Sequence, residues 1–409
     1  MSADADLRDS PAARRRLALA VLIGTIGSVG MWSFVVALPA VQADFGASRG
    51  AASLPYALAM AGFAFGGVPL GRLADRAGIT PALLIGAAAL GLGYVAAGFA
   101  PSLAVFAAAQ ALVGFGASAG FAPLMADLSH WFVKRRGLAV AIASSGNYLA
   151  GAIWPPLLQA SIDAYGWRAT HVGTGLIALA CLAPLALMMR RRLAARADAA
   201  AVPRPADAPA FSQRALLALL VLAGFSCCVA MSMPQVHIVA YCADLGYGPA
   251  RGAQMLSLML ALGVVSRLAC GLVADRIGGL RTLLIGSTLQ GLALFLYALF
   301  DGLASLYVIS ALFGLFQGGI VPMYGVIVRE YFPAAQAGGT LGIVVMSTLV
   351  GMAAGGWMSG AVYDLAGSYQ LAFLNGLAWN LVNVAVCALL IWRRRKPGPA
   401  QGGPSPAAA

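Results

Sequence analysis

Long apolar segments recur along the whole of this 409-residue chain, each close to the length that crosses a lipid bilayer. A membrane helix needs about 20 predominantly apolar residues, because its backbone polar groups must be bonded within the segment. Only 10% of the residues are charged and 61% are hydrophobic, which is unlike soluble globular domains. The sequence therefore predicts an all-α polytopic membrane protein.

Twelve helices are predicted, in two groups of six. They cover about 17–39, 52–71, 80–99, 102–127, 138–160, 171–189, 214–241, 253–273, 282–300, 303–328, 339–363 and 369–392. The first apolar run is too long for the core of a signal peptide, so we interpret it as a retained span. The predicted division is a tail at 1–16, a bundle at 17–189, a linker at 190–213, a second bundle at 214–392 and a tail at 393–409.

The basic residues predict the orientation of these helices. The connections that follow the even-numbered predicted helices, which include the linker, carry nearly all of the 26 Lys and Arg residues together with the two tails. The other connections carry only Arg49, Arg168 and Arg251. By the positive-inside rule, both termini are expected in the cytoplasm, with the chain in the cytoplasmic (inner) membrane. This placement explains the net charge of +12 without nucleic-acid binding.

The two halves repeat each other at a constant offset of 200 residues. GRLADRAG at 71–78 corresponds to GLVADRIG at 271–278, and LLIG at 83–86 corresponds to LLIG at 283–286. Both copies enter the membrane from the same side. Parallel repeats of this kind are typical of transporters built from two six-helix halves.

Each copy of the repeated loop carries a charged pair, Asp75-Arg76 in the first half and Asp275-Arg276 in the second. A carboxylate at this place can bind the positive N-terminus of a neighbouring helix or an arginine of a facing loop. We therefore predict that these four residues form a gate at the cytoplasmic mouth. The alternative is a turn with solvated charges.

The repeated loop resembles the signature of the major facilitator superfamily. Other segments resemble its monocarboxylate-porter branch, including bacterial members similar to oxalate/formate antiporters: WFVKRRGLAVAIASSG at 131–146, DAYGWRATH at 163–171, SRLACGLVADRIG at 266–278 and YFPAAQAGGTLG at 331–342. The resemblance covers the chain apart from its tails and linker. It implies alternating access, packing of helix 52–71 against helix 339–363, and a substrate carboxylate bound by the arginine of helix 253–273.

That arginine, Arg267, is a charge inside a predicted membrane helix. Burying an arginine there costs at least about 2.5 kcal/mol, so a functional role is the default interpretation. No Asp or Glu is predicted inside a span, and an unpaired guanidinium can bind a carboxylate through two parallel N–H groups. The alternative is a side chain that extends to the membrane surface. Gly263 stands where animal members of the branch have an aspartate.

Five further side chains at mid-helix depth are candidates for a substrate cavity, namely Trp32, Asn147, His237, Gln317 and Tyr324. Each can instead pack against neighbours or satisfy nearby backbone groups. His237 is the one histidine away from the predicted cytoplasmic loops and helix starts. With no carboxylate inside the membrane, it is the best available proton carrier.

The predicted function is secondary active transport of a small organic anion, a monocarboxylate, coupled to protons. We expect a monomer in the lipid bilayer, with no catalytic residue, cofactor, metal or nucleic acid. The alternatives are anion exchange, or export of a larger and less charged compound. A non-transporting sensor needs an output domain, and a membrane enzyme needs a catalytic or metal-binding cluster; the sequence indicates neither.

The predicted orientation can be tested by cysteine labelling in a variant without the six native cysteines. Single cysteines in the linker (190–213) and near both termini should resist an impermeant maleimide added to intact cells, and react once the membrane is opened. Ala47→Cys, in the first connection on the opposite face, is the control that should react from outside. Labelling of the linker in intact cells would overturn the assignment of spans.

Overall fold

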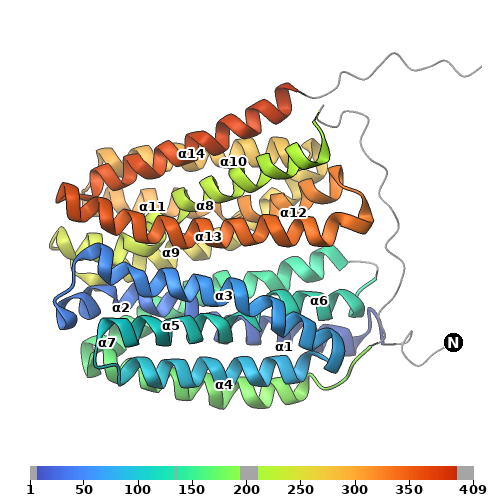
Figure 1. The fold of residues 1–409 in the computed structure, drawn as a ribbon, viewed down its shortest axis with the longest axis horizontal. Helices are drawn as coiled ribbons and strands as arrows, with labels where there is room; N and C mark the ends of the chain where they lie inside the picture. The colour runs from blue at the N-terminus through green and yellow to red at the C-terminus, as the bar shows by residue number, and fades with distance from the viewer. Residues whose placement is uncertain (1–6, 134–135, 194–210, 394–409) are drawn as a thin grey trace, which may run out of the picture.

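The computed structural model describes residues 7–133, 136–193 and 211–393, and no strand occurs within these ranges. The predicted linker and tails lie partly outside them, at 194–210, 1–6 and 394–409. The described helices form two groups, coloured blue to green and yellow to red in Figure 1. We call them the first half (α1–α7) and the second half (α8–α14).

The first half contains α1 (Pro11–Gly27), α2 (Val29–Phe45), α3 (Arg49–Ala77), α4 (Ile79–Gly98), α5 (Leu103–Ser118), α6 (Ala122–Trp131) and α7 (Arg136–Met188). The second half contains α8 (Gln213–Asp244), α9 (Pro249–Ile277), α10 (Gly279–Leu299), α11 (Leu303–Gln317), α12 (Ile320–Tyr331), α13 (Ala334–Ala366) and α14 (Tyr369–Trp392).

These helices join into eleven described segments that are long and apolar enough to cross a membrane. One of them, 137–188, has 52 residues and would be about 78 Å long if straight, more than twice the thickness of the hydrocarbon core. Gly166 interrupts it with φ 77° and ψ 161°, so the chain turns there and crosses twice. The predicted all-α fold with twelve membrane helices is confirmed, and the protein is a multi-pass membrane protein.

Two of the crossings are broken near their middle by a proline. Pro123 follows the break between α5 and α6, and Pro322 follows the break between α11 and α12. Proline has no N–H, so the carbonyls of Ala119 and Gly318, four residues earlier, lack their helical donor. The carbonyl of Gly318 is thereby free to accept a hydrogen bond from a side chain.

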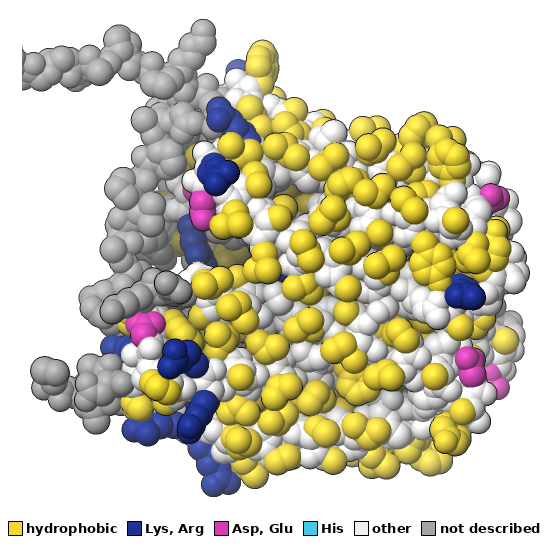
Figure 2. Space-filling model, turned by 180° about the vertical axis from the view of Figure 1, so that it is seen from behind, with side chains coloured by type: hydrophobic (Ala, Val, Ile, Leu, Met, Phe, Trp, Pro, Cys, Tyr) yellow, Lys and Arg dark blue, Asp and Glu magenta, His cyan; other side chains and the backbone are white. Residues whose placement is uncertain are grey.

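The two ends of the bundle differ in charge. We call the end with residues 190–193 the linker side and the opposite end the far side. Figure 2 shows Lys and Arg gathered at the linker side, and hydrophobic side chains over the surface between the two ends. The exposed arginines of the linker side include Arg14, Arg15, Arg190, Arg191 and Arg276. An apolar belt between polar ends is typical of a surface that contacts lipid.

The halves meet mainly where α2 packs against α8, α3 against α13, and α7 against α9. The contact of α3 with α13 is the packing that the family resemblance implied. It is closest near the far side, where a Cβ atom on Gly356 would lie 2.7 Å from the ring of Tyr56. A Cβ atom on Gly360 would lie 2.7 Å from the carbonyl oxygen of Arg49. Glycine at these positions therefore lets the two backbones approach.

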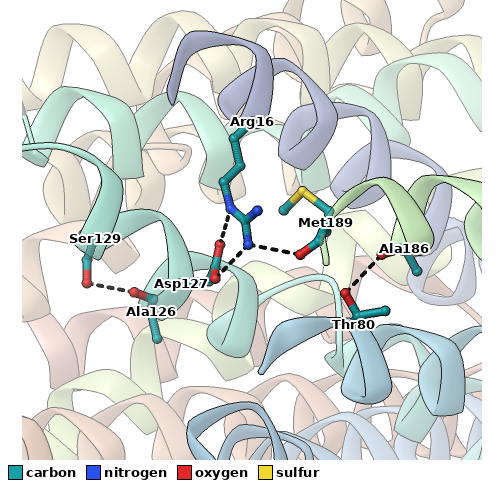
Figure 3. Close-up of polar contacts among 7 residues, drawn as sticks. All are labelled: Arg16, Thr80, Ala126, Asp127, Ser129, Ala186 and Met189. Atoms are coloured by element: carbon teal, nitrogen blue, oxygen red, sulfur yellow. Dashed lines mark hydrogen bonds and ion pairs between the residues drawn. The ribbon is translucent and has the colours of Figure 1, made fainter. Parts of the chain in front are cut away.

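A buried ion pair holds the first half together at the linker side (Figure 3). Arg16 Nε and Nη2 donate to the two carboxylate oxygens of Asp127 at 2.7 and 2.8 Å, and Nη2 also donates to the carbonyl of Met189 at 3.2 Å. The two charged side chains are only 5% and 13% exposed. The pair thus joins α1, α6 and the end of α7.

Asp127→Asn should destabilise the protein, because it leaves the Arg16 guanidinium buried without its counter-charge. Breaking one partner of a buried pair costs about 3–5 kcal/mol. Denaturant unfolding of the purified protein in detergent measures this loss. Asp75→Asn, which removes an exposed carboxylate, is the matched control, and the double replacement Arg16→Met with Asp127→Leu should restore much of the stability. An unchanged unfolding midpoint for Asp127→Asn would contradict this role.

Candidate functional site

α7 of the first half and α9 of the second half pack closely, and their contact carries the candidate site. A Cβ atom on Gly151 would collide with Leu260, and one on Gly263 would collide with the ring of Tyr148. The hydroxyl of Ser257 donates to the carbonyl of Ala152 across the same contact. Glycine at 151 and 263 is therefore required for this approach.

Arg267 extends from α9 into this contact and bonds to both halves. Its Nε donates to the carbonyl of Gly318, in its own half, at 3.2 Å. Its Nη1 donates to the carbonyl oxygen and the hydroxyl of Ser144, in the other half, at 3.1 and 3.3 Å. The break before Pro322 makes the carbonyl of Gly318 available, so the broken helix prepares one side of the site.

Among the described residues, an aromatic ring and no acidic side chain faces the charge of Arg267. Its Cζ lies 4.0 Å from the ring centroid of Tyr148, close enough for a cation–π interaction. In the part of the chain that the structure describes, Arg16, Arg49 and Arg168 each form an ion pair with an aspartate, whereas Arg267 forms none. Nη2 of Arg267 has no hydrogen bond there either. The positive charge is therefore available to an anion.

Three of the other predicted residues lie on or contact the stretch of α7 that Arg267 contacts. Gln317 is fully buried, and its Oε1 accepts a hydrogen bond from the hydroxyl of Tyr148 at 3.3 Å, while its Nε2 has no partner among the described residues. Asn147 precedes that tyrosine and accepts from the indole of Trp32 at 3.1 Å. The structure thus brings Arg267, Gln317, Asn147 and Trp32 together around one stretch of α7.

Tyr324 belongs to a different group of polar side chains, inside the second half. It is fully buried and its hydroxyl donates to Asn383 Oδ1, between α12 and α14, at 3.2 Å. Asn383 in turn donates to the hydroxyl of Ser287 on α10 at 2.7 Å. These contacts account for Tyr324 as a link between three helices of its own half.

His237 lies in another polar group, which connects the halves at the far side. Its Nε2 lies 2.8 Å from the carbonyl of Gly356, which can only accept, so Nε2 carries the proton. In the neutral ring, Nδ1 then accepts from the hydroxyl of Tyr369 at 3.0 Å. That hydroxyl accepts from Arg49 Nη1 at 2.7 Å. His237 is 0% exposed, so its ring is closed off from solvent in this conformation.

Arg49 is the centre of this far-side group. Its Nη2 donates to both carboxylate oxygens of Asp244, at 3.0 and 3.1 Å. The backbone N–H groups of Arg49 and Gly50 donate to Asp364 at 2.8 and 2.7 Å, where the N-terminus of α3 favours a carboxylate. Each of these bonds joins one half to the other.

Apart from the bond from Ser257 to Ala152, the hydrogen bonds that join the halves within the described ranges lie in the far-side group or around Arg267. The structure is therefore closed at the far side, and its linker side has no such connection among those residues. Asp75, Arg76, Asp275 and Arg276 are exposed there. The N-terminus of α10 is capped by Glu330, whose Oε1 accepts from Gly279 N at 3.0 Å, and not by Asp275. The gate predicted from these four residues stays a prediction.

Sequence reasoning missed the partners that the opposite half provides. Tyr148 lies beside Asn147 in an apolar helix, and the sequence indicates only Asn147 as a cavity candidate. Asp244 and Asp364 end their helices and resemble solvated caps. One signal was present, since Arg49 is one of three basic residues on a face that otherwise lacks them.

Comparison with known proteins gives one family. The sequence pattern described as Major Facilitator Superfamily matches residues 20–308 and 268–408. The chain is 28% identical over 383 residues to monocarboxylate transporter 13 of Bos taurus, covering 91% of this chain and 86% of that protein. It is 29% identical over 327 residues to monocarboxylate transporter 11 of Homo sapiens, covering 75% and 68%. It is 27% identical over 287 residues to the agnestins efflux protein AgnL12 of Paecilomyces divaricatus, covering 69% and 64%.

Solved structures show the same fold at low sequence identity. A crystal structure of a mutant of the nucleoside transporter NupG aligns with a TM-score of 0.73 and 13% identity, covering 91% of this chain and 99% of that one. A bacterial homologue of the human lysosomal transporter Spinster, in an inward-facing and unoccupied conformation, aligns with a TM-score of 0.70 and 14% identity, covering 95% and 100%.

Proposed function

Because the chain belongs to the major facilitator superfamily, whose members are transporters and not enzymes, we propose that it carries a small monocarboxylate by alternating access of its two halves. One observation carries this proposal. Arg267 lies at the contact between the halves with no carboxylate of the described chain beside it. The names of the vertebrate relatives agree with a monocarboxylate.

In the proposed site, the carboxylate binds the guanidinium of Arg267 through two hydrogen bonds. Such charge-assisted pairs are short, strong and planar. Gln317, with a buried and unpartnered Nε2, and Asn147 with Trp32 line the same region. Since Arg267 bonds to both halves, an anion bound to it lies at a contact that changes when the halves move relative to each other. With the far side closed, the anion would reach this site from the linker side.

We propose that the linker side faces the cytoplasm and that the protein is a monomer in the cytoplasmic membrane. The exposed arginines at that end support this orientation through the positive-inside rule. The gate residues Asp75, Arg76, Asp275 and Arg276 would then act at the cytoplasmic mouth when that side closes.

We also propose that transport is coupled to protons through His237, at a place separate from the carboxylate site. The charged and titratable groups around it are Tyr369, Arg49, Asp244, Tyr363 and Asp364. A second proton on the ring would remove the acceptor for Tyr369 and add positive charge near Arg49. Protonation would therefore oppose closure of the far side, and closure would oppose protonation.

Export of a larger and less charged compound is the second candidate, supported by the similarity to a fungal efflux protein. The two candidates differ in what they require of Arg267. A carboxylate depends on its charge, whereas a compound without an anionic group does not.

Arg267→Gln should weaken binding of carboxylates by at least about tenfold, because a hydrogen bond to a charged group contributes about 1.5–3 kcal/mol. Arg267→Lys should restore part of the affinity, since a point charge lacks the planar pair of donors. Calorimetry on purified protein, with a panel of two- to six-carbon monocarboxylates and their amides, measures this. The amides should bind weakly and equally to all three proteins. Unchanged carboxylate affinity in Arg267→Gln would remove the main support for an anion.

His237→Gln should abolish the acceleration of uptake by acid outside, while exchange of pre-loaded substrate continues. Glutamine can donate to Gly356 and accept from Tyr369, so it imitates the neutral ring but takes up no proton. Uptake into proteoliposomes at several outside pH values gives the readout. His130→Gln, on α6, is the control that should keep the pH response. A full pH response in His237→Gln would favour exchange as the driving reaction.

A further inference from the structure

The guanidinium of Arg267 has only one nitrogen free for a substrate. Nε bonds to Gly318 and Nη1 bonds to Ser144, whereas Nη2 has no partner among the described residues. The guanidinium fork offers two edges for a carboxylate, Nε with Nη2 and Nη1 with Nη2. The two N–H groups of Nη1 have two acceptors on Ser144, so an anion that binds through either edge competes with Gly318 or with Ser144.

Displacing Gly318 costs more than displacing Ser144. The carbonyl of Gly318 has no helical donor, because the residue four positions on is Pro322, and a buried carbonyl without a partner is costly. The carbonyl of Ser144 is in the interior of α7, where the amide of Tyr148 is its helical donor. The hydroxyl of Ser144 also donates to the carbonyl of Ala141 at 2.9 Å. Ser144 thus keeps partners when Arg267 leaves it.

The ring of Tyr148 can hold the guanidinium while its hydrogen bonds are exchanged. Its interaction with Arg267 uses the face of the guanidinium, so all N–H groups stay available in the plane. The ring is itself fixed by its packing in the space that Gly263 leaves, and its hydroxyl donates to Gln317. The unpartnered Nε2 of Gln317 adds a buried donor beside this arrangement.

We propose that Tyr148 is a positioning residue for Arg267, and that the substrate's carboxylate takes the Nη1–Nη2 edge in place of Ser144. This inference rests on the proposed function. The arginine belongs to the second half, whereas Tyr148 and Ser144 belong to the first. Substrate binding therefore replaces hydrogen bonds between the halves, from Arg267 to Ser144, by bonds to the anion. The loaded carrier has fewer bonds across the α7–α9 contact than the empty carrier.

Calorimetry with the same panel of two- to six-carbon monocarboxylates tests the role of Tyr148. Tyr148→Leu should bind about tenfold more weakly than wild type, a difference of about 1.4 kcal/mol. Tyr148→Phe, which keeps the ring, should bind like wild type. In an Arg267→Gln background, Tyr148→Leu should have no further effect, because the ring acts through the arginine. Trp392→Leu, which removes the ring beside Arg393 at the exposed end of α14, is the matched control and should change nothing.

The outcomes separate this inference from the proposed function. If Arg267→Gln weakens binding but Tyr148→Leu does not, the positioning role is wrong and the anion site stands. If Arg267→Gln has no effect, the proposed function itself fails. Should Tyr148→Leu not fold, Tyr148→Met fills the space without a ring and should show the same loss. Ser144→Ala removes a competing acceptor and should bind the anion at least as tightly; weaker binding would mean that the anion does not displace Ser144.

Discussion

A charge inside a membrane protein must find a partner, because hydrocarbon offers none. Arg16 meets this requirement with Asp127 at 2.7 Å, and Arg49 meets it with Asp244 at 3.0 Å. Arg267 is treated differently, since it has two carbonyls, a hydroxyl and an aromatic ring, but no carboxylate among the described residues. Some of its N–H groups have hydrogen-bond acceptors, but no carboxylate of the described chain neutralises its positive charge. This is the arrangement that a binding site for an anion needs.

The shape of the site depends on atoms that proline and glycine lack. Pro322 lacks an N–H, and this frees the carbonyl of Gly318 for Arg267. Gly263 lacks a Cβ atom, and this leaves space for the ring of Tyr148. Beside Arg267, this space holds an aromatic ring from the other half and no acidic side chain of the described chain. The arginine then meets a polarised face and not a fixed negative charge.

Much of the fold could be predicted, because its causes are local. Apolar length gives the helices, and the 200-residue repeat gives their parallel halves. Arg267 could also be predicted, since a single charge in an apolar helix is conspicuous. Its partners could not be predicted, because periodicity along one helix does not identify the helix against which that helix packs. His237 therefore resembled a cavity residue, whereas its contacts with Gly356 and Tyr369 place it in the far-side group.

The two connections between the halves differ in what can release them. Asp244, with a side chain 31% exposed, lies at the edge of the far-side group, so water can solvate its charge and that of Arg49 as this side opens. The bond from Arg267 to Ser144 is the one that the proposed anion would replace. On the proposed function, the far-side connection thus yields to solvent and the one at Arg267 to substrate. A carrier built in this way would move its halves most readily when the site is occupied.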